Sequence, residues 1–461
     1  MARRAADIAS LPPSVRPDLF GGHFRSFRGD PTGFLTRLSR LGDVAAFRMG
    51  PQRAFLVNHP DLIRDLLVVN AHKFKKGRAL QRARSLLGDG LLTAEGEFHL
   101  RQRRMIQPAF HKTRIAEYAR TMVDYAERMS GSWSDGDVRD IDHEMMHLTL
   151  QIVGKTLFGA EVGDEADEVG RAMTTLVSMF NFLLLPFSEW LEKLPLPQSR
   201  RYRHARDTLN SVIYGIIDER RRSGEDKGDL LSMLLLAQDE DDGRGMSDEQ
   251  VRDEALTLFL AGHETTANAL TWTWYLLSEN PEVEAKLHEE MRISDFGFRN
   301  AGDRSEIPQS EIRDPQSPYV EAVVAESMRL YPPAWTVGRL AIEEHELGGY
   351  RIPKGSLVLA SQWVMHRDPR FWDEPEAFRP ERWLAAGRSV KEAGQRFIYF
   401  PFGGGTRRCI GEGFAWTEAT LLLATLARRW RLRLVPEQKI DLQPMITLRP
   451  KFGMRMRLER R

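Results

Sequence analysis

The sequence feature that most constrains this chain is its single cysteine, Cys409, which lies in the glycine- and arginine-rich segment 402–411. A lone thiol cannot form an internal disulfide, so Cys409 can serve only in packing, in nucleophilic chemistry or as a metal ligand. The nearby glycines give the backbone conformational freedom and keep side chains out of the path of a flat ligand. Arg407 and Arg408 add positive charge, which favours a thiolate over a thiol. The surroundings of Cys409 therefore favour metal ligation.

An isolated cysteine is most often a small buried hydrophobe without chemistry, and Cys409 alone leaves that alternative open. The wider pattern resembles the haem-binding loop of the cytochrome P-450 superfamily at five positions: Phe402, Gly405, Arg407, Cys409 and Gly411. A thiolate is the axial ligand that pushes electron density onto haem iron and favours O–O cleavage. The resemblance implies that Cys409 ligates the iron of haem b. No C-x-x-C-H segment is present, so the haem would not be attached covalently.

Hydrophobic periodicity predicts a mainly helical chain. Ser247 and Gln250 form a capping-box signal for an apolar helix that should end near Asn280. At about 33 residues this helix would be roughly 50 Å long and could cross the whole molecule. Other helices are expected over 318–331 and from Cys409 to about 430, while strands are expected over 44–49, 53–57 and 356–364.

The resemblance covers nearly the whole chain and implies a mainly α fold with a small β region. In that fold a helical prism surrounds haem and the minor sheets are antiparallel. A length of 461 residues alone would suggest about three domains. The resemblance implies instead a flexible tail over 1–20 and one haem-thiolate monooxygenase domain over 21–461.

Net charge, the N-terminal segment and the cysteine content bear on partners and on the cellular compartment. Lys and Arg total 66 against 65 Asp and Glu, so the global charge points to neither nucleic acid nor a membrane surface. The first ten residues carry no apolar run long enough for a signal peptide or an anchor. One cysteine also fits a reducing compartment. We therefore expect a cytoplasmic protein without a membrane anchor. In this respect the chain resembles the bacterial members of the superfamily. We also expect a monomer.

A second motif lies in the middle of the long predicted helix. Gly262 costs about 1 kcal/mol relative to alanine there and lets the helix open towards a ligand. The segment resembles the oxygen-activation motif of the superfamily, with Glu264 as the acid and Thr265 as the alcohol. Activation of O₂ consumes two protons, so a carboxylate and a hydroxyl relay suit the chemistry. The alternative is a kinked core helix with a solvated glutamate.

Glu326 and Arg329 are spaced i, i+3 on one helical face. Such a pair is usually a surface salt bridge worth well under ~1 kcal/mol. Together with Arg382 in the segment 378–383, it resembles the Glu–Arg–Arg network of the superfamily, whose role is structural. Removing one partner from a buried network of this kind costs about 3–5 kcal/mol.

Several basic residues suit the two propionates of haem. His99 and Arg103 are spaced i, i+4 on a predicted helix, so two donors can grip one anion. Histidine stands where many relatives have tryptophan, and both rings carry an N–H donor. Arg339 and Arg407 resemble the remaining propionate-binding arginines. The alternative is that His99 is an ordinary surface residue.

The substrate pocket is expected to be apolar. The resemblance places Leu258, Ala261, Ala334 and Val337 in its lining, and the segment 179–187 with Trp190 in a lid. No fixed charge stands out among them, so a terpene, a fatty acid or a polyketide is expected. Segments such as 57–60 and 74–77 resemble actinobacterial sesquiterpene oxygenases of the pentalenene-oxidising type.

The chain has no G-x-G-x-x-G after a predicted strand and no room for a flavin reductase, so electrons should come from another protein. An acidic ferredoxin or flavodoxin could be steered to local positive charge. The residues that would supply this charge are Arg101, Arg104, Lys391, Arg396, Arg407 and Arg408, any of which could equally be a solvated surface residue.

The expected activity is insertion of one atom of O₂ into a hydrophobic small molecule, by hydroxylation or epoxidation. A peroxygenase or isomerase on the same fold is the enzymatic alternative, and a haem sensor is the non-enzymatic one. Neither needs the acid–alcohol pair that Glu264 and Thr265 form here.

Overall fold

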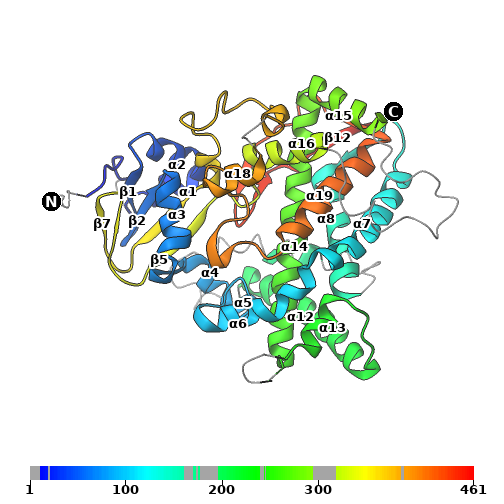
Figure 1. Cartoon of the computed structure of the whole chain (residues 1–461), viewed down its shortest axis with the longest axis horizontal. Helices are drawn as coiled ribbons and strands as arrows, with labels where there is room; N and C mark the ends of the chain where they lie inside the picture. The colour runs from blue at the N-terminus through cyan, green and yellow to red at the C-terminus, as the bar shows by residue number, and fades with distance from the viewer. Residues whose placement is uncertain are drawn as a thin grey trace. The chain divides into compact units, whose positions relative to one another are not determined.

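The computed structural model describes residues 11–18, 21–159, 170–172, 175–176, 196–238, 243, 245–293, 318–385 and 389–461. The chain divides into two compact units (Figure 1). The first unit comprises Met1–Gln81, Arg329–Ala377 and Ala385–Cys409, and the second comprises Arg82–Met328, Phe378–Leu384 and Ile410–Arg461. The expectation of one domain over 21–461 stays a prediction.

The first unit is built on a five-stranded sheet in the order β1-β2-β8-β5-β3. Its strands are β1 (Val44–Met49), β2 (Gln52–Val57), β3 (Phe74–Lys76), β5 (Val337–Ala341) and β8 (Leu357–Ala360). The predicted hairpin is confirmed, because β1 and β2 pair antiparallel from Val44 opposite Val57 to Met49 opposite Gln52. Strand β2 pairs parallel with β8, and all other pairs in this sheet are antiparallel.

Short helices and a small hairpin complete the first unit. They are α1 (Phe24–Gly29), α2 (Pro31–Ser39), α3 (Pro60–Arg64), η1 (Asp65–Val69), η2 (Ala71–Lys73), α4 (Arg78–Arg82), β6 (His345–Leu347), β7 (Tyr350–Ile352), α17 (Gln362–Met365), α18 (Val390–Gln395) and η5 (Gly405–Arg407). The strand predicted over 356–364 is too long. It ends at Ala360, because Ser361 accepts a hydrogen bond from Val364 N and starts α17.

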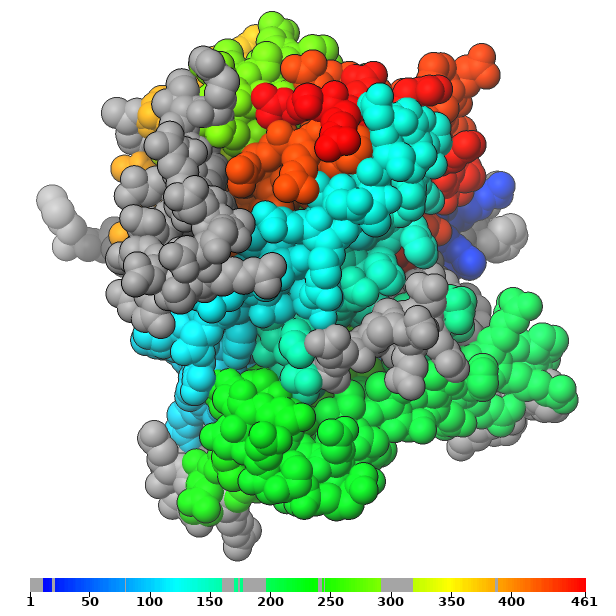
Figure 2. Space-filling model, turned by 90° about the vertical axis from the view of Figure 1, so that its right-hand side faces the viewer, coloured from blue at the N-terminus to red at the C-terminus, as the bar shows by residue number. Residues whose placement is uncertain are grey.

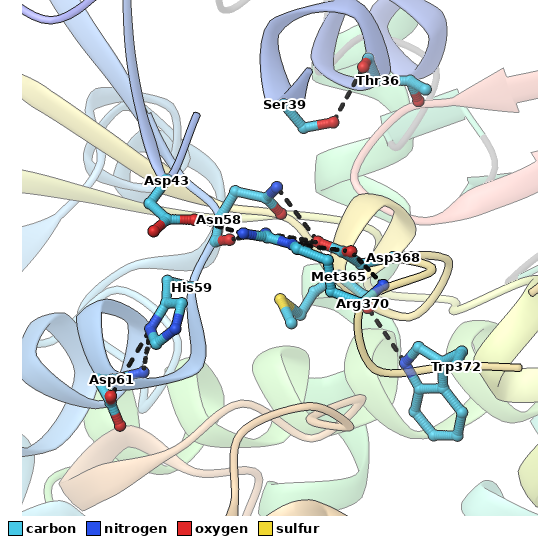
Figure 3. Close-up of polar contacts among 10 residues, drawn as sticks. All are labelled: Thr36, Ser39, Asp43, Asn58, His59, Asp61, Met365, Asp368, Arg370 and Trp372. Carbon is cyan, nitrogen blue, oxygen red and sulfur yellow. Dashed lines mark hydrogen bonds and ion pairs between the residues drawn. The ribbon is translucent and has the colours of Figure 1, made fainter. Parts of the chain in front are cut away.

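Arg370 holds the segment after α17 against the start of the sheet (Figure 3). Its guanidinium contacts Asp368, Asp43 at 2.6 Å and the carbonyl oxygen of Asn58 at 2.6 Å. The Asn58 side chain in turn donates to Asp368 at 3.4 Å. The sequence analysis did not assign these residues to the site, and their contacts are structural.

The second unit is mainly helical (Figure 1). Its helices are α5 (Arg84–Leu87), α6 (Gly96–Ile106), η3 (Gln107–Phe110), α7 (Lys112–Ser132), α8 (Ile141–Phe158), α12 (Pro197–Ser223), α13 (Leu230–Leu236), α14 (Asp248–Glu279), α15 (Pro281–Ile293), α16 (Pro318–Leu330), η4 (Pro380–Trp383) and α19 (Glu412–Ala427). Its strands are β4 (Val138–Asp140), β9 (Trp430–Leu434), β10 (Leu442–Pro444), β11 (Leu448–Pro450) and β12 (Arg455–Arg460). They form a three-stranded sheet β4-β12-β9 and the hairpin β10–β11, all antiparallel.

Helix α14 is the core of the second unit. Its 32 residues begin with the predicted capping box of Ser247 and Gln250 and end before Asn280, as the sequence indicates. It packs against α8, α12 and α19, and nearly all its faces are buried, including Trp272 and Trp274. Helix α7 lies against α19 on the face shown in Figure 2, where they appear in cyan and orange. Within the described residues, none of the helices combines the length and the apolar character needed to cross a bilayer.

Candidate functional site

The loop around Cys409 is closed by its own backbone. Cys409 N donates to the carbonyl oxygen of Phe402 at 2.9 Å, and Arg408 N donates to that of Gly405 at 3.1 Å. The Cys409 side chain is exposed. Two residues further on, Gly411 is the N-cap of α19. An exposed thiol is the opposite of the buried hydrophobe that an isolated cysteine usually is, so the packing alternative is disfavoured.

Two of the four glycines in this loop, Gly404 and Gly405, lie against protein where a Cβ would not fit. Gly405 has φ +68°, and a Cβ there would collide with the carbonyl oxygen of Leu67 in η1. A Cβ on Gly404 would lie 2.6 Å from the ring of Phe397. The sequence analysis attributed these glycines to the approach of a flat ligand. The structure shows that Gly404 and Gly405 let the loop lie against η1 and Phe397.

Arg329 and His366 support the segment that leads to this loop. The Arg329 guanidinium donates to the carbonyl oxygens of His366 at 2.8 Å, Pro375 at 2.6 Å and Ala377 at 3.0 Å. His366 Nε2 accepts a hydrogen bond from Phe400 N at 2.9 Å. The sequence analysis treated the stretch from His366 to Pro369 only as structural, and this link to the loop was missed.

The carboxylate of Glu326 is fully buried and accepts hydrogen bonds from described donors on the segment 379–383. They are Arg382 Nε at 2.8 Å, Trp383 Nε1 at 2.8 Å and Arg379 N at 3.0 Å. The structure thus brings together Glu326 and Arg382 of the predicted network. Trp383 is an additional partner that the sequence analysis did not assign.

Three cationic residues gather around β3 in the first unit. Arg407 donates to the carbonyl oxygen of Phe74 at 3.1 Å, and Arg339 on β5 lies opposite Lys76 on β3. Arg339 and Lys76 are both buried. Two buried cations and the half-buried Arg407 fit a doubly anionic ligand such as the propionates of haem. The sequence analysis missed Lys76, which reaches Arg339 only through the pairing of β3 with β5.

His99 and Arg103 lie one turn apart on α6, as their spacing predicts. His99 is only 4% exposed, so the alternative of an ordinary surface histidine is wrong. Arg103 is half-buried. A histidine and an arginine on one helical face provide the donors that one propionate needs.

Helix α14 has an uncovered strip near its middle. Ala261 is exposed, and Gly262 and Thr265 are half-buried, although the residues before and after them are buried. The Thr265 hydroxyl donates to the carbonyl oxygen of Ala261 at 2.7 Å. A Cβ on Gly262 would lie 3.0 Å from Val153, so this glycine lets α8 approach closely. The strip places Ala261 and Thr265 where a ligand can reach them.

Glu264 is buried next to this strip. Its Oε1 accepts a hydrogen bond from the Thr447 hydroxyl at 2.5 Å and lies 3.9 Å from Arg449 Nε. Burial raises the pKa of Glu264, while Arg449 and the Thr447 hydroxyl oppose the rise. The alternative of a solvated glutamate at this position is wrong, because Glu264 is buried.

The structure describes some of the other residues that were predicted to line the substrate pocket. Leu258 is buried, whereas Ala334 and Val337 are half-buried in the first unit. The segment 179–187 and Trp190 lie outside the described residues.

Haem fits the residues that the structure describes. The first unit offers an exposed thiol in a closed loop and the cations Lys76, Arg339 and Arg407. The second unit offers His99 with Arg103 and the uncovered strip of α14. In the first unit, the thiolate suits haem iron and the cations suit the propionates. In the second unit, His99 and Arg103 suit a propionate.

Comparison with known proteins also identifies this chain as a haem protein. The profile described as Cytochrome P450 matches residues 12–455. A cyclooctatin synthase of Streptomyces melanosporofaciens is 40% identical over 93% of this chain and 91% of its own length. A cyclooctat-9-en-7-ol 5-monooxygenase of that organism is 40% identical over 90% of this chain and 88% of its own. A pentalenene oxygenase of Streptomyces avermitilis is 35% identical over 98% of both chains. The chain therefore belongs to the cytochrome P450 family of haem-thiolate monooxygenases, which act on hydrophobic small molecules.

Proposed function

We propose that this enzyme inserts one oxygen atom of O₂ into a terpenoid, by hydroxylation or epoxidation. The names of three similar proteins describe oxidation of pentalenene, oxidation of cyclooctat-9-en-7-ol and synthesis of cyclooctatin. Ala261, Ala334 and Val337 are small or apolar and accessible, which suits a bulky hydrocarbon. The exposed Cys409 thiol in its closed loop carries the oxygenase part of the proposal, and the names of the relatives carry the terpenoid part.

The roles of the site residues follow from their chemistry. Cys409 would ligate the iron of haem, and haem would supply the oxidising chemistry when bound. Glu264 and Thr265 deliver protons. His99, Arg103, Arg339 and Arg407, with Lys76, bind the propionates, while Phe402 and Gly411 shape the cysteine loop. Glu326, Arg329 and Arg382 hold the surrounding backbone, and Leu258, Ala261, Ala334 and Val337 contact substrate.

Electrons are proposed to come from a ferredoxin or a flavodoxin that binds a monomer of this protein. Exposed basic residues support an acidic partner, because opposite charge speeds encounter. Arg408 and Lys391 are exposed in the first unit and Arg104 is exposed in the second. Salt should therefore slow electron transfer from the partner.

Reconstitution with a ferredoxin and its reductase under ¹⁸O₂ tests the proposal, with terpenoids, fatty acids and polyketides supplied in parallel. One ¹⁸O atom in a terpenoid product is the expected result. Replacement of Thr265 by alanine should keep NADH consumption while lowering product per NADH, because proton delivery becomes misdirected. Product formed with peroxide alone and unchanged coupling in T265A would instead favour a peroxygenase.

A further inference from the structure

Side-chain donors reach backbone carbonyl groups of α14 beside its uncovered strip. His263 Nδ1 donates to the carbonyl oxygen of Phe259 at 2.7 Å, because a carbonyl oxygen can only accept. The Thr265 hydroxyl donates to that of Ala261 at 2.7 Å. A further contact comes from another helix, because the hydroxyl of Thr149 on α8 donates to the carbonyl oxygen of His263 at 2.9 Å. Unlike the other two, the contact from Thr149 ties α14 to a neighbouring helix.

Helix α8 lies closely against this part of α14. Thr149 and Val153 are spaced i, i+4, so they form one face of α8, and both are fully buried. Val153 lies so near Gly262 that a Cβ on this glycine would be 3.0 Å from Val153 Cγ2. The absence of a side chain at Gly262 therefore lets the Thr149 hydroxyl reach the backbone of the next residue, His263.

The contact from Thr149 lies on the far side of α14 from the uncovered strip. Each residue advances an α-helix by about 100°, so Ala261 and Thr265 share one face and His263 lies nearly opposite them. Glu264 follows His263 in the chain and is buried beside the strip. A tie to the backbone at His263 thus fixes the turn that carries both Glu264 and Thr265, and it leaves free the side that a ligand can reach.

The Thr149 hydroxyl also has acceptors in its own helix. It lies 2.9 Å from the carbonyl oxygen of Met145 and 3.3 Å from that of Met146. A hydroxyl carries one hydrogen, so α8 and α14 share it. Thr156, further along α8, is the simpler case, because it is buried and donates to the carbonyl oxygen of Ile152 at 2.7 Å, within its own helix. Thr156 therefore provides a control for the loss of a buried hydroxyl.

We propose that Thr149 is a positioning residue for proton delivery, because it holds the turn of α14 that carries Glu264 and Thr265. The inference rests on the proposed role of these two residues in delivering protons. The Thr149 hydroxyl donates to the His263 carbonyl oxygen and sets how far this turn lies from α8. Loss of the hydroxyl lets the turn move, so the Glu264 carboxyl and the Thr265 hydroxyl are displaced from the positions that proton delivery requires.

Thr149→Val tests the inference, because valine keeps the shape of threonine and removes the hydroxyl. Thr149→Ser is the conservative variant, and Thr156→Val is the matched control. In T149V we expect about threefold less product per NADH than in wild type, because proton delivery becomes less well directed. T149S should restore the wild-type yield. T156V should also keep it, although this variant too loses a buried hydrogen bond.

A readout that needs no turnover accompanies these assays. In protein labelled with ¹³C at histidine carbonyl carbons, the NMR resonance of His263 is identified by its absence from His263→Gln. In the reduced, carbon-monoxide-bound state, which is diamagnetic, this resonance should move in T149V, because its carbonyl loses a hydrogen bond, and stay in place in T156V. The substrate-induced Soret shift should be unchanged in T149V, and its loss would contradict a role confined to proton delivery.

Variants at the facing glycine test the same contact without changing Thr149. The added methyl group of Gly262→Ala meets Val153, so it should separate α14 from α8 and lower the product per NADH as T149V does. Combining G262A with Val153→Ala removes the collision and should restore the yield. These variants decide the question if T149V does not fold.

The two possible failures are separable. A yield in T149V equal to that of an active wild-type enzyme, or an equal loss in T156V, would overturn the inference and leave the proposed function intact. A His263 resonance that does not move in T149V, or a G262A enzyme as well coupled as wild type, would overturn it as well. A wild-type enzyme that forms no oxygenated product would overturn the proposed function itself.

Discussion

At the scale of single residues, Gly405 shows how local geometry restricts the cysteine loop. It combines φ +68° with a position where any Cβ would meet the carbonyl oxygen of Leu67. Gly349 has φ +80° with open space around it, so a substitution there measures only the cost of the backbone conformation. We expect Gly349→Ala to cost about 1 kcal/mol and Gly405→Ala clearly more, measured by urea unfolding. Equal losses in the two variants would show that contact with η1 is unimportant.

Glu418 is a buried carboxyl whose effect on the free energy of unfolding depends on pH. It is fully buried in α19, and both its oxygens lack a hydrogen-bond partner among the described residues. The nearby Thr266 side chain acts to lower the pKa of Glu418, but its hydroxyl is not oriented to form a hydrogen bond with the carboxyl. Burial raises the pKa of Glu418 to about 8. The folded protein therefore retains a proton that the unfolded chain loses near pH 4.5.

Between pH ~5 and ~8 this residue should reduce the free energy of unfolding by about 1.4 kcal/mol per pH unit. Glu418→Gln should remove the slope, so that the variant is more stable than wild type at pH 9 and similar to it at pH 5. Glu127→Gln, an exposed position on α7, is the control and should leave the slope in place. Parallel unfolding curves for wild type and E418Q at all pH values would contradict this account.

At the scale of elements, a buried ion pair joins three helix ends. Arg220, near the end of α12, donates to Asp229 at 2.7 Å and to the carbonyl oxygen of Phe158, the last residue of α8, at 3.3 Å. Asp229 is also the N-cap of α13 and accepts from Ser232 N at 2.8 Å. Burial disfavours the charged form of Asp229. The hydrogen bonds from Arg220 and Ser232 outweigh the effect of burial, so the pKa of Asp229 is lowered.

Asp229→Ala should therefore cost about 3–5 kcal/mol in unfolding free energy at neutral pH, because it leaves a buried guanidinium without its partner. The difference from wild type should shrink as pH falls through the folded-state pKa of Asp229. Asp207→Ala removes an exposed pair with Arg206 and should change stability by less than about 0.5 kcal/mol. A loss for D229A as small as that for D207A, seen in denaturant titrations, would show that the buried pair is dispensable.

Elements with strong local signals could be predicted from the sequence. The capping box of Ser247 and Gln250 located the start of α14, and Pro281 located its end. The strand over 356–364 was predicted too long because Ser361 acts as a helix cap, which apolar β-forming residues in sequence do not reveal.

At the scale of the whole molecule, residues tied to a motif could be proposed from the sequence, and residues brought in by folding could not. Cys409, Glu264 and His99 stand at recognisable spacings in the sequence. Thr447 and Arg449 contact Glu264 from almost two hundred residues away, and Lys76 reaches its cationic neighbours through the pairing of β3 with β5. Nothing local in the sequence fixes such long-range contacts.

The central claim is a bond from the Cys409 sulfur to haem iron. The most direct measurement is the absorption spectrum of the reduced, haem-loaded protein under carbon monoxide, for wild type and Cys409→Ser. Wild type should show the red-displaced Soret band of a thiolate adduct, and C409S should lose that band while other variants such as T265A retain it. A wild-type spectrum without the displacement, or a C409S spectrum that keeps it, would contradict the account.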